Sequence, residues 1–231
     1  LGPDHPDVAE VTDFIGILHS RAGRFAEAVQ QHERAQATME RALGPGHNRV
    51  AEILNNLCKA YKDWGQYAKA QPVCERSIDI AVAALGAGFH GVGCTRNHYA
   101  DVLCGQGKYE QGIREARTAL ALLEKSVGPK HRWVAASLTA LGMCTVDSNE
   151  PAAAIAPLKR SLSLREAKPS DPLELAKTRF AMARALQASG EGSSGAVSLA
   201  QQARQAYAEA PERRRGELEA IDRWLAKVPG P

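Results

Sequence analysis

Three histidines recur at one position of the sequence and are the first candidates for chemistry. His5, His47 and His131 each lie in a short polar linker, at a spacing of 42 residues or a multiple of it. Imidazole is a common zinc ligand, but a zinc site needs several ligands at close spacing, and no companion ligand accompanies these histidines. We therefore expect them to cap or pack the linkers, and we predict neither a metal nor a cofactor.

The five cysteines are candidates for redox chemistry. No Cys-x-x-Cys pair occurs. Cys94 and Cys104 fall on one expected helix about 15 Å apart, which is too far for a disulfide. An odd number of cysteines without ligand spacing is typical of free thiols in a reducing compartment. We expect free thiols and a cytoplasmic protein. The residues concerned are Cys58, Cys74, Cys94, Cys104 and Cys144.

Motifs of the common enzyme classes are missing from the sequence. The glycine-rich stretch 190–195 lacks the Gly-Lys-Ser/Thr that holds phosphates, and neither Gly-x-Ser-x-Gly nor His-Glu-x-x-His occurs. We find no nucleophile–base pair and predict that the chain is not an enzyme by itself.

Charge and hydropathy exclude further classes. The net charge is +3, with 24% of the residues charged. Acidic and basic residues are interspersed, which argues against a nucleic-acid binder or a membrane-surface binder. No run of about 18 apolar residues is present, so we predict no membrane partner. The remaining candidates for function are surfaces that bind proteins.

The elements that must position such a surface are repeats of 42 residues. Within each repeat, one helical pattern ends at a glycine or asparagine and a second one follows. Small residues recur in phase on the second pattern, where two helices can approach closely only if one side chain is tiny. A fixed period of this length indicates a solenoid of helix pairs. The turn residues are Gly23, Gly65, Gly107 and Asn149, and the small residues are Ala28, Ala70, Gly112, Ala154 and Ala196, then Ala35, Ser77, Ala119, Ser161 and Ala203.

The repeat divides the chain into five helix pairs and a tail. We place the pairs at 1–42, 43–84, 85–126, 127–168 and 169–210. Residues 211–231 form a C-terminal capping helix and tail, because Leu218, Ile221, Leu225 and Val228 follow a helical period. An amphipathic last helix covers the exposed end of a solenoid.

The second copy places large, small and aromatic residues at fixed positions of its two helical patterns, namely Leu57, Cys58, Tyr61, Gly65, Tyr67, Ala70, Cys74 and Ser77. This pattern resembles the tetratricopeptide repeat. The linkers 1–9 and 43–51 and the length of 42 residues resemble the kinesin-light-chain variety of this repeat. The resemblance implies an all-α fold, a right-handed superhelical solenoid.

The C-terminal part of the chain has a resemblance of its own. The segments 183–210 and 213–228 resemble the C-terminal ends of bacterial signalling proteins, notably serine/threonine kinases. We therefore interpret the chain as part of a longer polypeptide.

The resemblance to the tetratricopeptide repeat also implies a peptide-binding groove lined by the first helix of each pair. Amides offer a donor and an acceptor to an extended main chain. The family pattern fails at Asp13, Thr139 and Phe180, which stand where the first asparagine is expected. These side chains could instead be solvated or join neighbouring repeats. The groove positions are Asn55, Asn56, Lys59, Asn97, His98 and Asp101, with Asp13 and Ile17 beside the first copy.

We therefore expect a scaffold that binds a protein or peptide in this groove, as part of a bacterial signalling protein. One alternative is a regulatory or substrate-recruiting arm of a serine/threonine kinase. Another is an array that mediates self-association.

Overall fold

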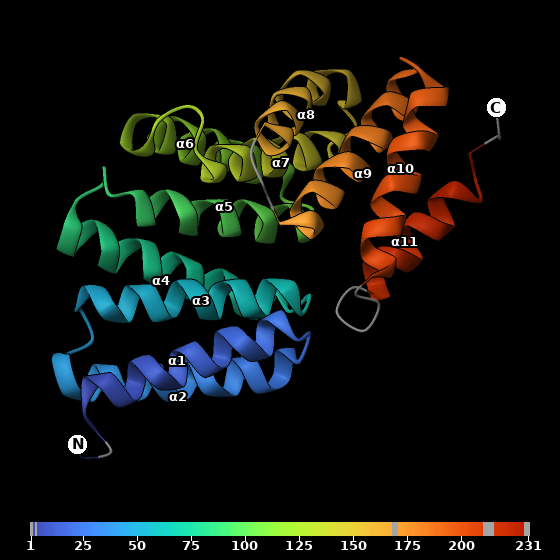
Figure 1. The fold of residues 1–231 in the computed structure, drawn as a ribbon. Coiled ribbons are helices and arrows are strands. Elements are labelled where there is room, and N and C mark those ends of the chain that lie inside the picture. Colours follow the sequence, from blue (N-terminus) through green and yellow to red (C-terminus); the bar gives the residue numbers. More distant parts are fainter. Residues whose placement is uncertain (1, 3, 168–170, 210–214, 229–231) are drawn as a thin grey trace. The chain divides into compact units, whose positions relative to one another are not determined.

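The computed structural model describes all residues except 1, 3, 168–170, 210–214 and 229–231 (Figure 1). All regular secondary structure in this part of the chain is helical, which confirms the expected all-α fold. None of the described helices is both long and apolar enough to span a bilayer. The helices are α1 (Pro6–Arg21), α2 (Phe25–Leu43), α3 (Asn48–Asp63), α4 (Tyr67–Leu85), α5 (His90–Gly105), α6 (Tyr109–Val127), α7 (Arg132–Asp147), α8 (Pro151–Glu166), α9 (Pro172–Ser189), α10 (Ser193–Ala208) and α11 (Arg215–Leu225).

The recurring histidines cap helices, as the sequence predicted. Nδ1 of His5 accepts a hydrogen bond from the backbone N–H of Asp7 at 3.2 Å. His47 does the same for α3 and His131 for α7, also at 3.2 Å. Each ring satisfies one of the backbone N–H groups that have no partner in the first turn of a helix. In the fifth pair Asp171 takes this role for α9.

The turns inside the helix pairs need a left-handed residue, and the predicted positions supply one. Gly23, Gly65 and Gly107 have φ between 76° and 77°, and Asn149 has φ 67°. Glycine adopts this conformation at little cost, and asparagine tolerates it better than most other residues. In the fifth pair α10 begins at Ser193, so the helix includes the end of the glycine-rich stretch 190–195.

The in-phase small residues lie in the core. Ala28, Ala70, Ala154 and Ala196 are all fully buried, and Gly112 is buried at the same position of α6. The second series is buried as well, with Ser77 and Ser161 at the positions of the alanines. The close helix contacts predicted from the period are therefore present.

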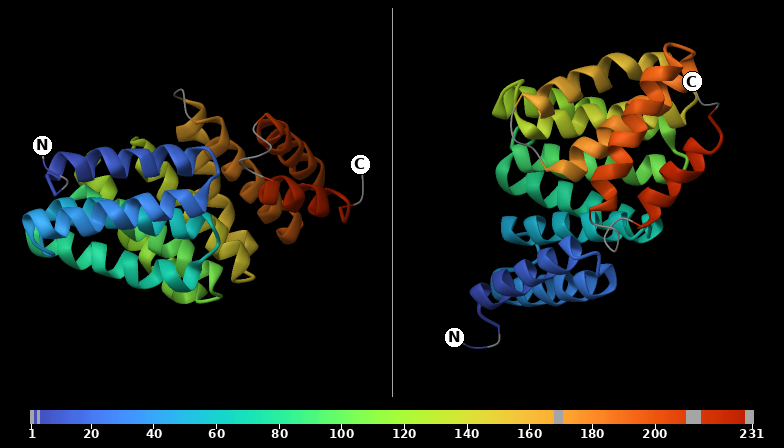
Figure 2. Two further views of the ribbon diagram at one scale, coloured as in Figure 1. Left: turned by 90° about the horizontal axis from the view of Figure 1, so that it is seen from below. Right: turned by 45° about the vertical axis from the view of Figure 1, so that its right-hand side comes forward.

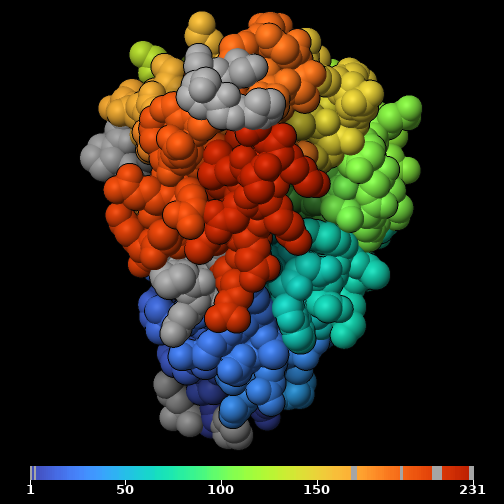
Figure 3. All heavy atoms as spheres, turned by 90° about the vertical axis from the view of Figure 1, so that its right-hand side faces the viewer, coloured from blue at the N-terminus to red at the C-terminus, as the bar shows by residue number. Residues whose placement is uncertain are grey.

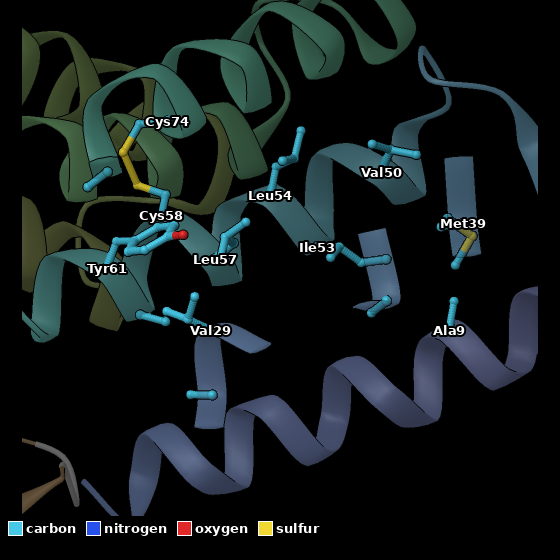
Figure 4. Packing of buried hydrophobic residues seen from close by; sticks show 14 of the residues in the cluster. Ala9, Val29, Met39, Val50, Ile53, Leu54, Leu57, Cys58, Tyr61 and Cys74 are labelled. Atoms are coloured by element: carbon cyan, nitrogen blue, oxygen red, sulfur yellow. A yellow bond between two sulfur atoms is a disulfide. The ribbon is translucent and has the colours of Figure 1, made fainter. Parts of the chain in front are cut away.

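The helices form two compact units, 1–127 and 128–231. In the first unit, α1 and α2 form one antiparallel pair, α3 and α4 the next, and α5 and α6 a third (Figures 1 and 2). Its largest apolar cluster joins the first two pairs through residues such as Met39, Ile53, Leu54 and Leu57 (Figure 4).

The second unit ends with the helix predicted as a cap. In this unit α7 to α10 form two pairs, and α11 packs against α10. Figure 3 shows the red surface of α11 against the orange surface of the helices before it. Ile221 is fully buried, and Leu218 and Leu225 pack on the same cluster. Val228 is half-buried beyond the end of α11. The start that we expected at Pro211 lies outside the described residues.

The prediction that all five cysteines are free thiols is wrong. Cys58 and Cys74 form a disulfide between α3 and α4, with Cα atoms 5.2 Å apart (Figure 4). Cys104 and Cys144 are likewise not free thiols. Cys94 retains its thiol. The sequence indicated that Cys58 and Cys74 occupy packing positions, but it did not show that the two positions face each other across the helix pair.

Candidate functional site

The eight predicted site residues lie on α1, α3 and α5, the first helices of the three pairs in the first unit. Helix α3 contacts both α1 and α5, so these helices form one continuous row. We call the surface that carries the eight residues the first-helix row. The hydrogen bonds and ion pairs along it separate the residues into three groups.

The first group joins α1 to the helices beside it. Oδ1 of Asp13 lies 2.7 Å from Nδ1 of His32 on α2, and Oδ2 accepts a hydrogen bond of 2.8 Å from the amide of Asn56 on α3. The ring of His32 is buried, with 1% of its surface exposed. Asp13 and Asn56 therefore link two repeats, which is the alternative that the sequence had left open for these positions.

The second group is a buried polar network between α3, α4 and α5. Oδ1 of Asn55 accepts a hydrogen bond from Thr95 at 3.0 Å. The hydroxyls of Thr95 and Ser77 are 3.4 Å apart, and Ser77 donates to the carbonyl of Ala51 at 2.8 Å. Asn55 is thus also engaged with the next repeat. A buried network of this kind is costly to leave half-satisfied, so it favours one fixed register between repeats.

The third group is a charged cluster on α3 and α5. Asp63 lies 2.6 Å from the ammonium groups of both Lys59 and Lys62, and Asp101 lies 3.6 Å from Lys62. Burial alone raises the pKa of Asp63, but the charges and hydrogen bonds of the two lysines outweigh it and hold the pKa well below its usual range. Asp63 stays ionised and fixes both lysines. The side chain of Lys59 is nevertheless 43% exposed.

His98 lies beside this cluster. Desolvation by burial, together with the positive charges of Lys62 and Lys59, lowers the pKa of His98 to about 3. The imidazole is therefore neutral at pH 7. A neutral ring carries one N–H donor and one acceptor nitrogen, so His98 can hydrogen-bond to a peptide main chain without adding charge.

Asn97 and Ile17 complete the predicted set. Asn97 is 7% exposed, and no donor in the described part of the chain reaches its buried Oδ1. Unsatisfied buried acceptors are rare in folded proteins and costly. Ile17 is half-buried on α1, at the position of Lys59 one repeat earlier.

Sequence reasoning missed four residues that organise the row, namely His32, Lys62, Asp63 and Thr95. One signal was available, because Lys59 and Asp63 stand four residues apart on one helix, a spacing that favours an ion pair. His32 and Thr95 act on neighbouring helices and have no such local signal. Among the described residues, no group of three His, Cys, Asp or Glu side chains is placed to hold a metal ion.

Comparisons with known structures extend the fold description. Repeats of a kinesin light chain-like protein from Podosopora anserina superpose with a TM-score of 0.66 at 19% identity, over 89% of this chain and 97% of that one. BtubC (BKLC) from P. vanneervenii gives a TM-score of 0.68 at 19% identity, over 98% and 84%. A Rap protein complexed with Competence and Sporulation Factor gives 0.74 at 15% identity, over 94% of this chain and 61% of the Rap chain. These similarities show a common fold.

A search of curated proteins finds no match. The family model of the tetratricopeptide repeat, in contrast, matches residues 7–82 and 91–167, which is more than half of the chain. The matched ranges cover the four helix pairs from α1 to α8, including the first-helix row. The chain belongs to the tetratricopeptide-repeat family.

Proposed function

We propose that the chain is a non-catalytic interaction module that binds an extended peptide or protein segment on the first-helix row. The fold supports a scaffold role, and the structurally similar Rap protein holds Competence and Sporulation Factor. The polar first helices provide hydrogen-bonding groups along one surface, which suits an extended main chain.

The observation that carries the proposal is that the charged cluster on α3 and α5 fixes a lysine that is still exposed to solvent. Lys59 is held by Asp63 yet remains 43% exposed, so its ammonium group is positioned before a ligand arrives. A group that is fixed in advance loses little conformational entropy on binding. We therefore assign the main ligand contacts to Lys59, His98 and Asp101. The ligand that best fits Lys59 is a peptide with a carboxylate near these residues.

The asparagines have unequal roles in this proposal. Asn55 and Asn56 are engaged with neighbouring repeats, so replacing them changes stability as well as binding. Asn97 differs, because its buried Oδ1 has no donor in the described part of the chain. A ligand N–H that reached this atom would satisfy it and gain a hydrogen bond.

The test is selection of binders from a displayed library of short random peptides, followed by affinity measurement on variants of the full chain. Lys59→Ala and His98→Ala should each weaken the selected peptides by about tenfold or more, because hydrogen bonds to charged or buried groups contribute strongly. Lys125→Ala, at an exposed position of α6, is the matched control and should bind normally. Equal affinity for all three variants would place the binding surface elsewhere.

We further propose that the chain is part of a bacterial signalling protein, and secondly that it recruits substrates for a serine/threonine kinase. Both rest on the resemblance of segments 183–210 and 213–228. The genomic sequence upstream of the codon for Leu1 is the direct test. A kinase signature in the same reading frame would support the kinase proposal, and a reading frame without one would contradict it. The interspersed charges favour a protein partner over a nucleic acid.

A cytoplasmic location is part of the same proposal, and the Cys58–Cys74 disulfide tests it. Disulfides are rare in a reducing cytoplasm. Protein extracted from cells under acid quench and treated with a thiol-alkylating reagent should be alkylated at Cys58 and Cys74 if the chain is cytoplasmic. Protection of both cysteines in that experiment would argue for an oxidising compartment.

A further inference from the structure

The Cys58–Cys74 disulfide lies in the helix pair that carries Lys59 of the proposed peptide site. Cys58 stands next to Lys59 on α3 and three residues after Asn55, which is less than one helical turn. Cys74 stands three residues before Ser77 on α4, and the hydroxyl of Ser77 belongs to the buried network that holds Asn55. The disulfide therefore fixes α3 against α4 within one turn of both the buried network and the charged cluster.

The other two helix pairs of the first unit pack without a covalent bond at this contact. The pair α1–α2 has Gly16 and His32 there, and α5–α6 has Ala100 and Ala116. Noncovalent packing is thus sufficient to hold a pair of this repeat together. The disulfide is not required to form a pair, so its redox state can change while the fold persists.

Reduction of the disulfide changes the contact between α3 and α4. Cys58 and Cys74 are both fully buried. Two thiols need more space than a disulfide, because unbonded sulfur atoms cannot approach each other as closely as bonded ones. In a close-packed contact this space is gained only when α3 moves away from α4. Reduction also releases a loop with a sequence separation of 16, so both helices gain conformational freedom.

We propose that Cys58 and Cys74 form a redox switch that sets the affinity of the first-helix row for its peptide. The inference rests on the proposed function, because it assigns a regulator to the site that contains Lys59. In the oxidised chain α3 is fixed before the ligand arrives, so little conformational entropy is lost on binding. In the reduced chain the peptide must also immobilise α3, so the affinity falls. Disulfides of cytoplasmic proteins are mostly transient and catalytic or redox-sensing, which agrees with the proposed location.

The switch operates by thiol–disulfide exchange with a small-molecule disulfide. The thiolate of one cysteine attacks a sulfur of that molecule and releases one small thiol. The thiolate of the other cysteine attacks the mixed disulfide, forms the Cys58–Cys74 bond and releases the second small thiol. The two protein thiols are oxidised, the small disulfide is reduced, and the two thiol protons pass to the released thiolates. Because both sulfur atoms are buried, the exchange requires a local opening of α3 from α4.

Peptide binding and oxidation must favour each other by the same factor. Coupling between two equilibria is reciprocal, so a disulfide that raises the affinity for the peptide is itself favoured by the bound peptide. The switch can therefore be measured from either side, as an affinity or as a ratio of oxidised to reduced chain.

The first experiment measures the affinity of the full chain for peptides selected from the displayed library, before and after reduction with dithiothreitol. Reduction should weaken binding by about two- to tenfold, which corresponds to the cost of immobilising one flexible side chain. Cys58→Ala combined with Cys74→Ala is the matched control, and its affinity should not respond to dithiothreitol. If the control lost as much affinity as the native chain, other cysteines would carry the effect and the switch would be overturned. Loss of the helical circular dichroism signal on reduction would also overturn it, because the disulfide would then be needed for the fold.

Lys59→Ala in the same assay separates failure of the switch from failure of the proposed site. If this variant binds the peptides more weakly but reduction has no effect, the site stands and the switch is overturned. If the variant binds as the native chain does, the proposed site is wrong and the switch is wrong with it.

The second experiment measures the coupling from the other side. The chain is equilibrated in a glutathione buffer with and without saturating peptide, and alkylation followed by mass spectrometry gives the oxidised fraction of Cys58 and Cys74. The ratio of oxidised to reduced chain should rise with peptide by the factor by which reduction weakens binding. An unchanged ratio would contradict the switch.

Discussion

In each of the first two helix pairs, the two helices contact each other at the same repeat position, but the residues at that contact differ. In α1–α2 the position holds Gly16 and His32, and a Cβ atom added to Gly16 would lie 2.6 Å from the ring. In α3–α4 it holds the disulfide between Cys58 and Cys74. The repeat thus fixes the space between two helices, but not the residues that fill it.

The two later pairs extend the comparison. At the same position α5–α6 has Ala100 and Ala116, both fully buried. Helices α7–α8 have Gly142 and Leu158, and a Cβ on Gly142 would lie 2.4 Å from Cγ of Leu158. The helix pairs thus fill this contact in three ways: with a large residue opposite a glycine, with two alanines, or with a disulfide. Close packing constrains the combined volume of the pair, so each partner depends on the other.

Among changes at these helix contacts, His32→Ala should lower the stability of the chain most. It leaves a cavity opposite Gly16 and removes the partner of Oδ1 of Asp13. We expect a loss of about 2–4 kcal/mol in the free energy of unfolding, measured by urea denaturation of the helical circular dichroism signal. Arg34→Ala, at an exposed position of the same helix, should change it little. If His32→Ala destabilised the chain no more than Arg34→Ala does, the imidazole of His32 would not stabilise the contact between α1 and α2.

Removal of the disulfide should have the next largest effect. Cys58→Ala combined with Cys74→Ala gives the alanine pair already present in α5–α6, so the helices should form. The loop closed by the disulfide has a sequence separation of 16, which corresponds to roughly 3 kcal/mol of stabilisation. We expect a urea midpoint lower than that of the oxidised native chain. An unchanged midpoint would mean that packing alone stabilises this pair.

The pair Gly142–Leu158 tests whether volume is shared between the two sides. Gly142→Ala and Leu158→Ala should each destabilise the chain, the first by overpacking and the second by leaving a cavity. Because the double variant recreates the alanine pair of α5–α6, it should be more stable than the sum of the single effects predicts, by about 1–2 kcal/mol. Additive losses would show that the two positions do not share the space.

The smallest expected effect is a pH dependence of stability, which follows from the different neighbours of two histidines. His32 faces a carboxylate, whereas His98 faces lysines and has its pKa lowered to about 3. Between the unfolded pKa near 6.5 and pH 4, only the unfolded chain binds a proton at His98, so stability must fall as pH falls. Asp63 has a lowered pKa and adds its own loss only below about pH 4.

We expect about 1 kcal/mol less stability at pH 5.5 than at pH 7 from this source, and His98→Asn should remove that part. Urea midpoints of the two proteins at both pH values are the measurement. An equal loss in both proteins would assign the acid sensitivity to other groups.

Sequence reasoning predicted the helix pairs, turns and caps because each of them depends on local chemistry. His47 caps α3 and Gly65 ends its turn through contacts within a few residues. Sequence reasoning did not predict which faces of the helices are covered by other helices. Val11 and Ile53 share a repeat position, but one is exposed and the other buried, since only the second has a helix pair packed on it. The bond between Cys58 and Cys74 also depends on the rotation of two helices about their axes.

The same limit applies to the first-helix row. The repeat position of Asn55, Asn97 and Asp13 is predicted to meet a ligand, which stays a prediction. The sequence did not show that Asn55 also bonds to Thr95 and Asp13 to His32. These partners lie on other helices, at distances in sequence that the local pattern does not report. Lys59 and Asp63 could have been paired from the sequence, because a spacing of four residues on one helix is a local signal.

The order of the helix contacts also has a kinetic consequence. Within each unit, every helix packs on its neighbour in sequence or on the next helix but one. Contacts between residues close in sequence require little loop closure, so chains rich in them fold quickly. A helix pair can thus complete its own packing soon after it leaves the ribosome and then serve as the surface on which the following pair condenses.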